Sequence, residues 1–129
     1  MRKNTHIVGG ILFGFMGLLI LESFKRGALP HIGWSLESIL HMSFISIFLM
    51  AAMSIFGAIL PDIIDPPFTA KHRLFAHSKA LLFILLVLWA ISFISLLDRS
   101  SLGVLAIYYF LLGYISHLAL DSLTPSGLW

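Results

Sequence analysis

Two pairs of polar residues in this chain have the types and the spacing of metal ligands. His117 and Asp121 are four residues apart, so on a helix they would share one face, one turn apart. Asp62 and Asp65 are three residues apart and directly follow a leucine–proline pair. The chain has no cysteine, and imidazole nitrogen with carboxylate oxygen suits zinc, manganese, iron or magnesium. We expect a bound divalent metal ion, with zinc as the first candidate and the other three as alternatives.

Further residues extend this candidate site. His72 and His77 stand on either side of Arg73, and His6 lies near the start of the chain. The Arg73 guanidinium would suit a phosphate or another oxyanion. Seven candidates exceed the three or four ligands of one zinc, which leaves room for a second metal, a general base, or carboxylates that orient the histidines. The predicted ligands are His77, His117 and Asp121 as the core, Asp62 next, and His6 and His72.

These residues also have purely structural interpretations. Asp62 and Asp65 could simply end a helix ahead of two prolines, although two carboxylates at a helix C-terminus oppose the macrodipole and call for a cation. A metal ion would supply that charge, and so would Lys71 or Arg73. His77 could be an interfacial histidine beside a serine that caps the next helix. Spacing alone leaves these alternatives open.

The elements that must position these residues are membrane-spanning helices. Of the 129 residues, 59% are hydrophobic and 11% are charged, whereas soluble domains average about 45–50% apolar and about 25% charged residues. A spanning helix needs roughly 20 mostly apolar residues. Four stretches approach that length: residues 7–21, 39–60, 80–97 and 102–120. We predict an all-α fold, a polytopic membrane helical bundle of about four transmembrane helices in a single domain over residues 1–129.

The first apolar stretch has a competing interpretation as a signal peptide, because Arg2 and Lys3 precede it. No clear small-residue cleavage site follows it, which favours a helix that stays. Gly10 and Gly14 within it are four residues apart and would let another helix approach closely. The formal net charge of +2 is too small to suggest a nucleic-acid partner.

Four spans place the candidate residues on one side of the membrane. The first helix leaves that side, the second returns to it, the third leaves again and the fourth ends there. The opposite side also carries acids and histidines. The site side holds five basic residues against three on the other, which predicts a cytoplasmic site by the positive-inside rule. The five are Arg2, Lys3, Lys71, Arg73 and Lys79, and the three are Lys25, Arg26 and Arg99.

Several short motifs occur in a fixed order along the chain: Thr5-His6, Leu60-Pro61-Asp62-Ile63, His72-Arg73 with His77-Ser78, Gly113-Tyr114-x-Ser116-His117 with Asp121, and Thr124-Pro125-x-Gly127. In that order they resemble the YdjM-like inner-membrane proteins of bacteria and archaea, called membrane-bound metal-dependent hydrolases. The resemblance implies a multi-helix inner-membrane protein with a metal site and hydrolase activity. Many relatives read Asp-His after Leu-Pro-Asp, where this chain has Ile63-Ile64-Asp65, and many continue well past Thr-Pro-x-Gly. The chain is therefore expected to be either a short member or a truncated one.

Two classes of function follow from these patterns. The first is a metal-dependent hydrolase at the membrane surface, acting on a phospholipid or lipid-linked phosphoester, with Asp65 as the base that takes a proton from the attacking water and Arg73 as the oxyanion clamp. The second is a non-enzymatic membrane protein, such as a transporter, pore-forming toxin or assembly factor, with a structural metal or ion site. The mid-spans of the last three predicted helices hold no ionisable side chain, which disfavours an ion path through one protomer. The expected partners are membrane lipids, with a homo-oligomer left open.

Overall fold

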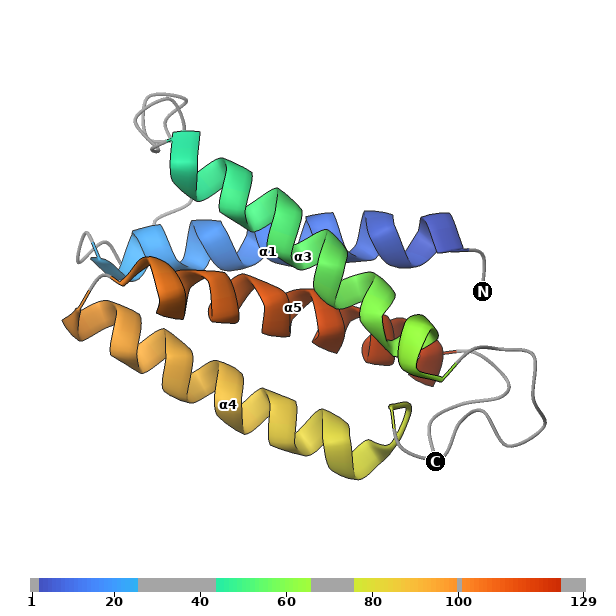
Figure 1. The fold of residues 1–129 in the computed structure, drawn as a ribbon. Coiled ribbons are helices and arrows are strands. Elements are labelled where there is room, and N and C mark those ends of the chain that lie inside the picture. The colour runs from blue at the N-terminus through green and yellow to red at the C-terminus, as the bar shows by residue number, and fades with distance from the viewer. Residues whose placement is uncertain (1–2, 26–43, 66–75, 100, 124–129) are drawn as a thin grey trace.

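The computed structural model describes residues 3–25, 44–65, 76–99 and 101–123. These residues form four helices, labelled as in Figure 1: α1 (Lys3–Lys25), α3 (Phe44–Ile64), α4 (Lys79–Asp98) and α5 (Leu102–Ser122). The described part of the chain contains no strand. The predicted all-α fold of four helices is thus confirmed.

Each helix is long and apolar enough to cross a membrane. A helix of 20 residues is about 30 Å long, which matches the hydrocarbon core of a bilayer. Large apolar side chains point outward, among them Phe44, Phe83 and Ile94. In water such a surface would cause aggregation, but in a bilayer it faces lipid.

The helix bounds differ in part from the expected ranges. The first helix was expected over residues 7–21 and spans Lys3–Lys25. The second was expected over residues 39–60, of which 39–43 lie outside the described residues, and it continues through Pro61 to Ile64. Proline removes one backbone donor, but the turn after Pro61 still closes, because Asp65 N donates to Pro61 O at 2.9 Å. Asp62 therefore lies inside the last turn of α3.

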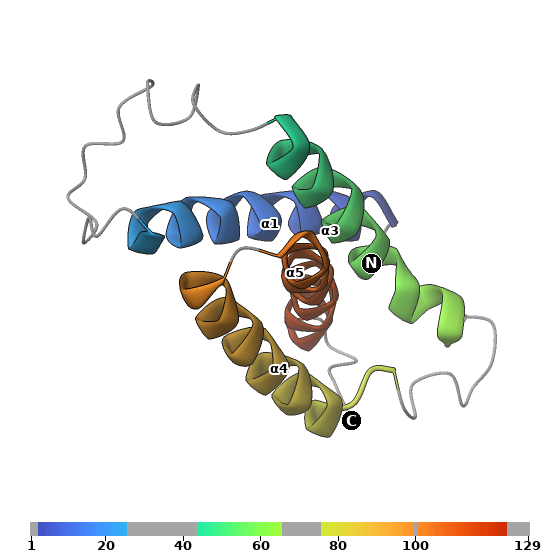
Figure 2. The ribbon, with the colours of Figure 1, turned by 60° about the vertical axis from the view of Figure 1, so that its left-hand side comes forward.

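Helix α5 is the central element of the bundle (Figure 2). It packs against α1, α3 and α4, whereas α3 and α4 make no contact with each other within the described residues. The Tyr108 hydroxyl at the first half of α5 is buried and donates to Gly17 O of α1 at 2.9 Å. Helices α4 and α5 also pack against each other.

Glycines bring the backbones of α1, α3 and α5 unusually close together. A Cβ on Gly57 of α3 would overlap the Phe110 carbonyl of α5, and one on Gly113 of α5 would overlap the Ser54 carbonyl of α3. A Cβ on Gly10 would lie 2.7 Å from the Ala58 Cβ. The close approach predicted for the glycines of the first helix is therefore observed, and its partner is α3.

We expect substitution of Gly113 to separate α3 from α5. Gly113→Ala should lower the melting temperature in detergent, because the new methyl meets backbone atoms that cannot rotate away, and overpacking of this kind costs about 1–3 kcal/mol. Gly103→Ala is the matched control, since the nearest atom to its new Cβ is Ser101 Oγ at 3.8 Å. Both changes raise helix propensity equally, so equal melting temperatures would contradict the packing argument.

Candidate metal centre

The predicted ligands meet at one end of the bundle. His6 lies in the first turn of α1, Asp62 in the last turn of α3, His77 just before α4, and His117 and Asp121 in the last two turns of α5. In Figure 1 these helix ends lie together on the side of the N-terminus. Asp65 is also near them, 3.9 Å from His77. His72 and Arg73 lie outside the described residues.

Three ligand atoms form a compact triangle at the core of the site. His77 Nε2 and His117 Nε2 are 3.2 Å apart, and Asp121 Oδ2 lies 3.3 Å from the first and 3.4 Å from the second. Zinc bonds of about 2.0–2.1 Å in a tetrahedral arrangement place neighbouring ligand atoms about 3.3 Å apart. The triangle thus has the dimensions of three corners of a zinc site.

His117 is oriented by the backbone of the neighbouring helix. Its Nδ1 lies 2.7 Å from Ala58 O of α3. A carbonyl can only accept, so Nδ1 carries the proton and donates, and the neutral ring presents the lone pair of Nε2 to the triangle. Metal-ligating histidines usually have their second nitrogen held in this way. The ring is fully buried, so this orientation is rigid.

His77 is oriented by the segment just before α4. Ser78 caps that helix by accepting a hydrogen bond from Leu81 N at 3.1 Å. Asp65 Oδ2 accepts from Ala76 N at 2.9 Å, and the Tyr114 hydroxyl donates to Ala76 O at 3.3 Å. The serine cap considered as an alternative role for this segment is therefore present, and it turns His77 inward rather than leaving it at the surface.

Asp65 lies behind His77 rather than beside the triangle. Its Oδ2 is 3.9 Å from His77 Nδ1, which is buried and has no hydrogen-bond partner among the residues that the structure describes. A proton on Nδ1 would face this carboxylate and leave the Nε2 lone pair free to ligate. The position suits a carboxylate that orients His77, and the predicted role of Asp65 as the base stays a prediction.

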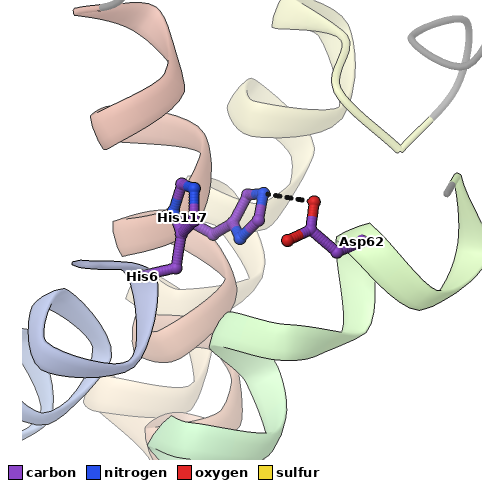
Figure 3. A group of neighbouring side chains, drawn as sticks. All are labelled: His6, Asp62 and His117. Carbon is purple, nitrogen blue, oxygen red and sulfur yellow. Dashed lines mark ion pairs between the residues drawn. The ribbon is translucent and has the colours of Figure 1, made fainter. Parts of the chain in front are cut away.

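Asp62 and His6 flank the triangle on opposite sides of His117 (Figure 3). Asp62 Oδ1 lies 3.7 Å from His117 Nε2 and 3.9 Å from His77 Nε2, and its side chain is 24% exposed. The His6 ring stacks on the His117 ring with centroids 3.9 Å apart, and His6 Nε2 lies 3.5 Å from Asp121 Oδ1. Two overlapping groups result, His77–His117–Asp121 and His6–Asp62–His117, each with its ligand atoms within 4.8 Å of one another.

The donor set fits a divalent cation. With protons on the outward nitrogens of His77 and His117, two Nε2 lone pairs and the Asp121 Oδ2 atom converge at 3.2–3.4 Å. A divalent cation among the three atoms would be bound by all of them. Burial and the nearby His117 lower the pKa of His77 below its ordinary value of 6.5, so the imidazole is neutral at pH 7 and available to ligate.

Sequence reasoning missed the groups that orient the ligands. Ala58 O and Ala76 N are backbone atoms, which no residue type reveals. The Gly113-Tyr114-x-Ser116-His117 motif did contain a signal, because each of its members has a packing role. Gly113 allows the close approach of α3, Tyr114 holds Ala76, and Ser116 Oγ donates to Gly113 O at 2.7 Å.

The family model described as "YdjM inner membrane protein" matches residues 1–128. No curated protein and no solved structure matches the chain. The match covers every residue of the site.

We predict that the protein binds a divalent metal through the triangle. The purified protein in detergent should carry near-stoichiometric metal, and a His117→Ala, Asp121→Ala double variant should lose it, because two of three closely spaced ligand atoms are gone. Ser122→Ala is the control, since this exposed hydroxyl bonds only locally, to Ala119 O. Metal content can be read by elemental mass spectrometry, and a full load in the double variant would refute the assignment.

The lowered pKa of His77 predicts a specific dependence on pH. Below pH 6.5 the unfolded chain takes up a proton that the buried imidazole does not, so the metal-free protein should lose stability as the pH falls through this range. Metal binding should persist somewhat below pH 6.5 and be lost at lower pH, when protons displace the cation from the imidazoles. Equilibrium dialysis and thermal unfolding at a series of pH values measure the two effects. Binding unchanged down to pH 4 would exclude histidine ligation.

Proposed function

Since the chain belongs to the YdjM inner membrane protein family, and its site lies at the ends of spanning helices, we propose that it is a metal-dependent hydrolase of a lipid or lipid-linked phosphoester. The protein is a multi-pass inner-membrane protein with four candidate transmembrane helices. The observation that carries the proposal is the triangle of His77 Nε2, His117 Nε2 and Asp121 Oδ2 with sides of 3.2–3.4 Å.

A divalent cation held there would polarise a phosphoryl oxygen and lower the pKa of water. The chain's own residues would hold and orient it. His77, His117 and Asp121 would be the ligands, and Asp62 lies beside them, with its Oδ1 3.7 Å from His117 Nε2. Ala58 O and Asp65 keep the two imidazoles turned inward. Three protein ligands with one open or exchangeable position is the pattern of catalytic zinc sites.

The position of the site limits the substrates that can reach it. The ligands come from the terminal turns of three helices and from the residue before a fourth, so the site lies near the membrane interface rather than at mid-span. Asp62, with a side chain 24% exposed, marks the side that opens outward. Head groups of lipids lie at this depth, which favours a scissile bond close to the interface.

An apolar cavity supports a lipid as the substrate. It has a volume of about 210 Å³ and lies among α1, α4 and α5, with Phe13, Ile20, Trp89 and Ile115 in its walls. Phe13 follows His6 by seven residues on α1, so the two lie on the same face of that helix, about 10 Å apart along its axis. A lipid with its phosphate at the site could place part of an acyl chain in this cavity.

We predict metal-dependent release of a head group or phosphate from bacterial lipids. Detergent-solubilised, metal-loaded protein should produce it, chelator should abolish it, and Asp121→Asn should reduce it by on the order of 100-fold or more, because a ligand charge is lost. Mass spectrometry of mixed lipids identifies the products, and Ser122→Ala is the control. Absence of turnover across all major lipid classes would favour the non-enzymatic alternative, a membrane protein with a structural metal or ion site.

The cavity can be tested in the same assay. Leu86→Trp would fill space in the cavity, whereas Ile91→Trp adds the same ring on an outward-facing part of α4. The first variant should raise the KM for long-chain lipids without changing turnover of a short soluble phosphoester, and the second should leave both unchanged. If Leu86→Trp changed the kinetics of both substrates equally, the cavity would not be a binding site for the lipid chain.

A further inference from the structure

We propose that the site holds two divalent cations, with Asp121 as the carboxylate that bridges them. The first cation would bind His77, His117 and Asp121 Oδ2, and the second would bind His6, Asp62 and Asp121 Oδ1. This inference rests on the proposed function and extends it from one metal position to two.

The candidate ligand atoms form two overlapping groups that share His117. The described residues contain His77–His117–Asp121 and His6–Asp62–His117 as separate sets, with His117 in both. A neutral imidazole has one lone pair, and His117 Nδ1 is committed to Ala58 O. His117 therefore ligates one cation only. Its shortest distances, 3.2 and 3.4 Å, are to His77 and Asp121, which assigns it to the first position.

Asp121 can complete the second group in place of His117. Its two oxygens point to different partners: Oδ2 lies 3.3 Å from His77 Nε2 and 3.4 Å from His117 Nε2, and Oδ1 lies 3.5 Å from His6 Nε2. A carboxylate divided in this way can bridge two metals, which in two-metal sites are about 3.5–4 Å apart. The stacked rings of His6 and His117, with centroids 3.9 Å apart, have the same spacing.

His6 also has the burial of a ligand without the hydrogen bonds of a structural residue. It is 3% exposed, and its Nδ1 is buried with no hydrogen-bond partner among the described residues. Burying a polar ring with so few partners is costly, so a histidine used only for packing is a poor choice at this position. Figure 3 shows its ring beside His117, on the side away from Asp62. A cation bound at Nε2, the nitrogen that faces Asp121 Oδ1, would give the buried ring a strong polar interaction.

The two positions should differ in affinity. The first is formed by three side chains that are each at least nine-tenths buried. The second includes Asp62, whose side chain is 24% exposed, so its cation would exchange more readily with solvent. Two divalent cations would also carry more positive charge than Asp62, Asp65 and Asp121 together carry negative charge. That surplus would attract a phosphate group to the outward side of the site.

Binding of Mn²⁺ tests the proposal without reference to activity. Detergent-purified protein should bind two Mn²⁺ per chain in two steps, and electron paramagnetic resonance should show the spectrum of a coupled pair once the second site fills. His6→Phe keeps a ring to stack on His117 but removes the ligand, so it should bind one Mn²⁺ and give the uncoupled six-line spectrum. Thr5→Ala, at an exposed neighbouring position, should behave as the unchanged protein.

The outcomes separate this inference from the proposed function. One uncoupled Mn²⁺ per chain in the unchanged protein would overturn the second position and leave the one-metal hydrolase standing. No Mn²⁺ and no Zn²⁺ in the unchanged protein would overturn both. A coupled pair in His6→Phe would show that His6 is not a ligand. His6→Gln, checked by gel filtration for a folded particle, repeats the test if the phenylalanine variant does not fold.

Discussion

The backbone contact between α3 and α5 determines the geometry of the site. Gly57 and Gly113 lie where the two helices meet, and neither has room for a side chain. The next residue on α3 is Ala58, whose carbonyl accepts the hydrogen bond from His117 one turn beyond Gly113. A bond of 2.7 Å between helices is available only because the backbones approach this closely. The tautomer of His117, and hence the direction of its lone pair, thus depends on the absence of side chains at Gly57 and Gly113.

Membrane packing explains why α5 carries two of the ligands. It packs against the other three described helices, more extensively than any of them, and all of its residues from Leu111 to Leu118 are buried. An imidazole and a carboxylate can be kept away from lipid only on such a helix. Helix α4, by contrast, buries few residues and contributes its ligand from the segment before its first turn. The ionisable side chains therefore lie where a helix is surrounded by protein, whatever the hydropathy of that helix.

The sequence was informative about the spans and about which candidate residues lie together, but not about how the helices pack. Hydropathy predicted four helices, and counting crossings brought His6, Asp62, His77, His117 and Asp121 to one side before any contact was known. Packing could not be predicted from periodicity, because the lipid-facing and protein-facing sides of a membrane helix are both apolar. The second apolar stretch was expected to end at Leu60, whereas α3 continues through Pro61 to Ile64, because a membrane helix tolerates proline. The role of Ala58 depends on a backbone atom and had no signal in the residue types.

The site contains residues of the first and the last described helices, so it cannot be complete until the last of these helices has been synthesised. His6 enters the membrane with α1, while His117 and Asp121 arrive with α5 after all the other described helices have been synthesised. A complete set of donors therefore exists only after the four described spans have been inserted, so a metal ion would be bound after insertion of α5. A bound cation would stabilise the packing of the helices that supply its ligands, because its binding free energy would be lost if they separated. Chelation would then loosen the bundle as well as empty the site, and the cellular supply of metal would set how long the protein survives membrane proteolysis.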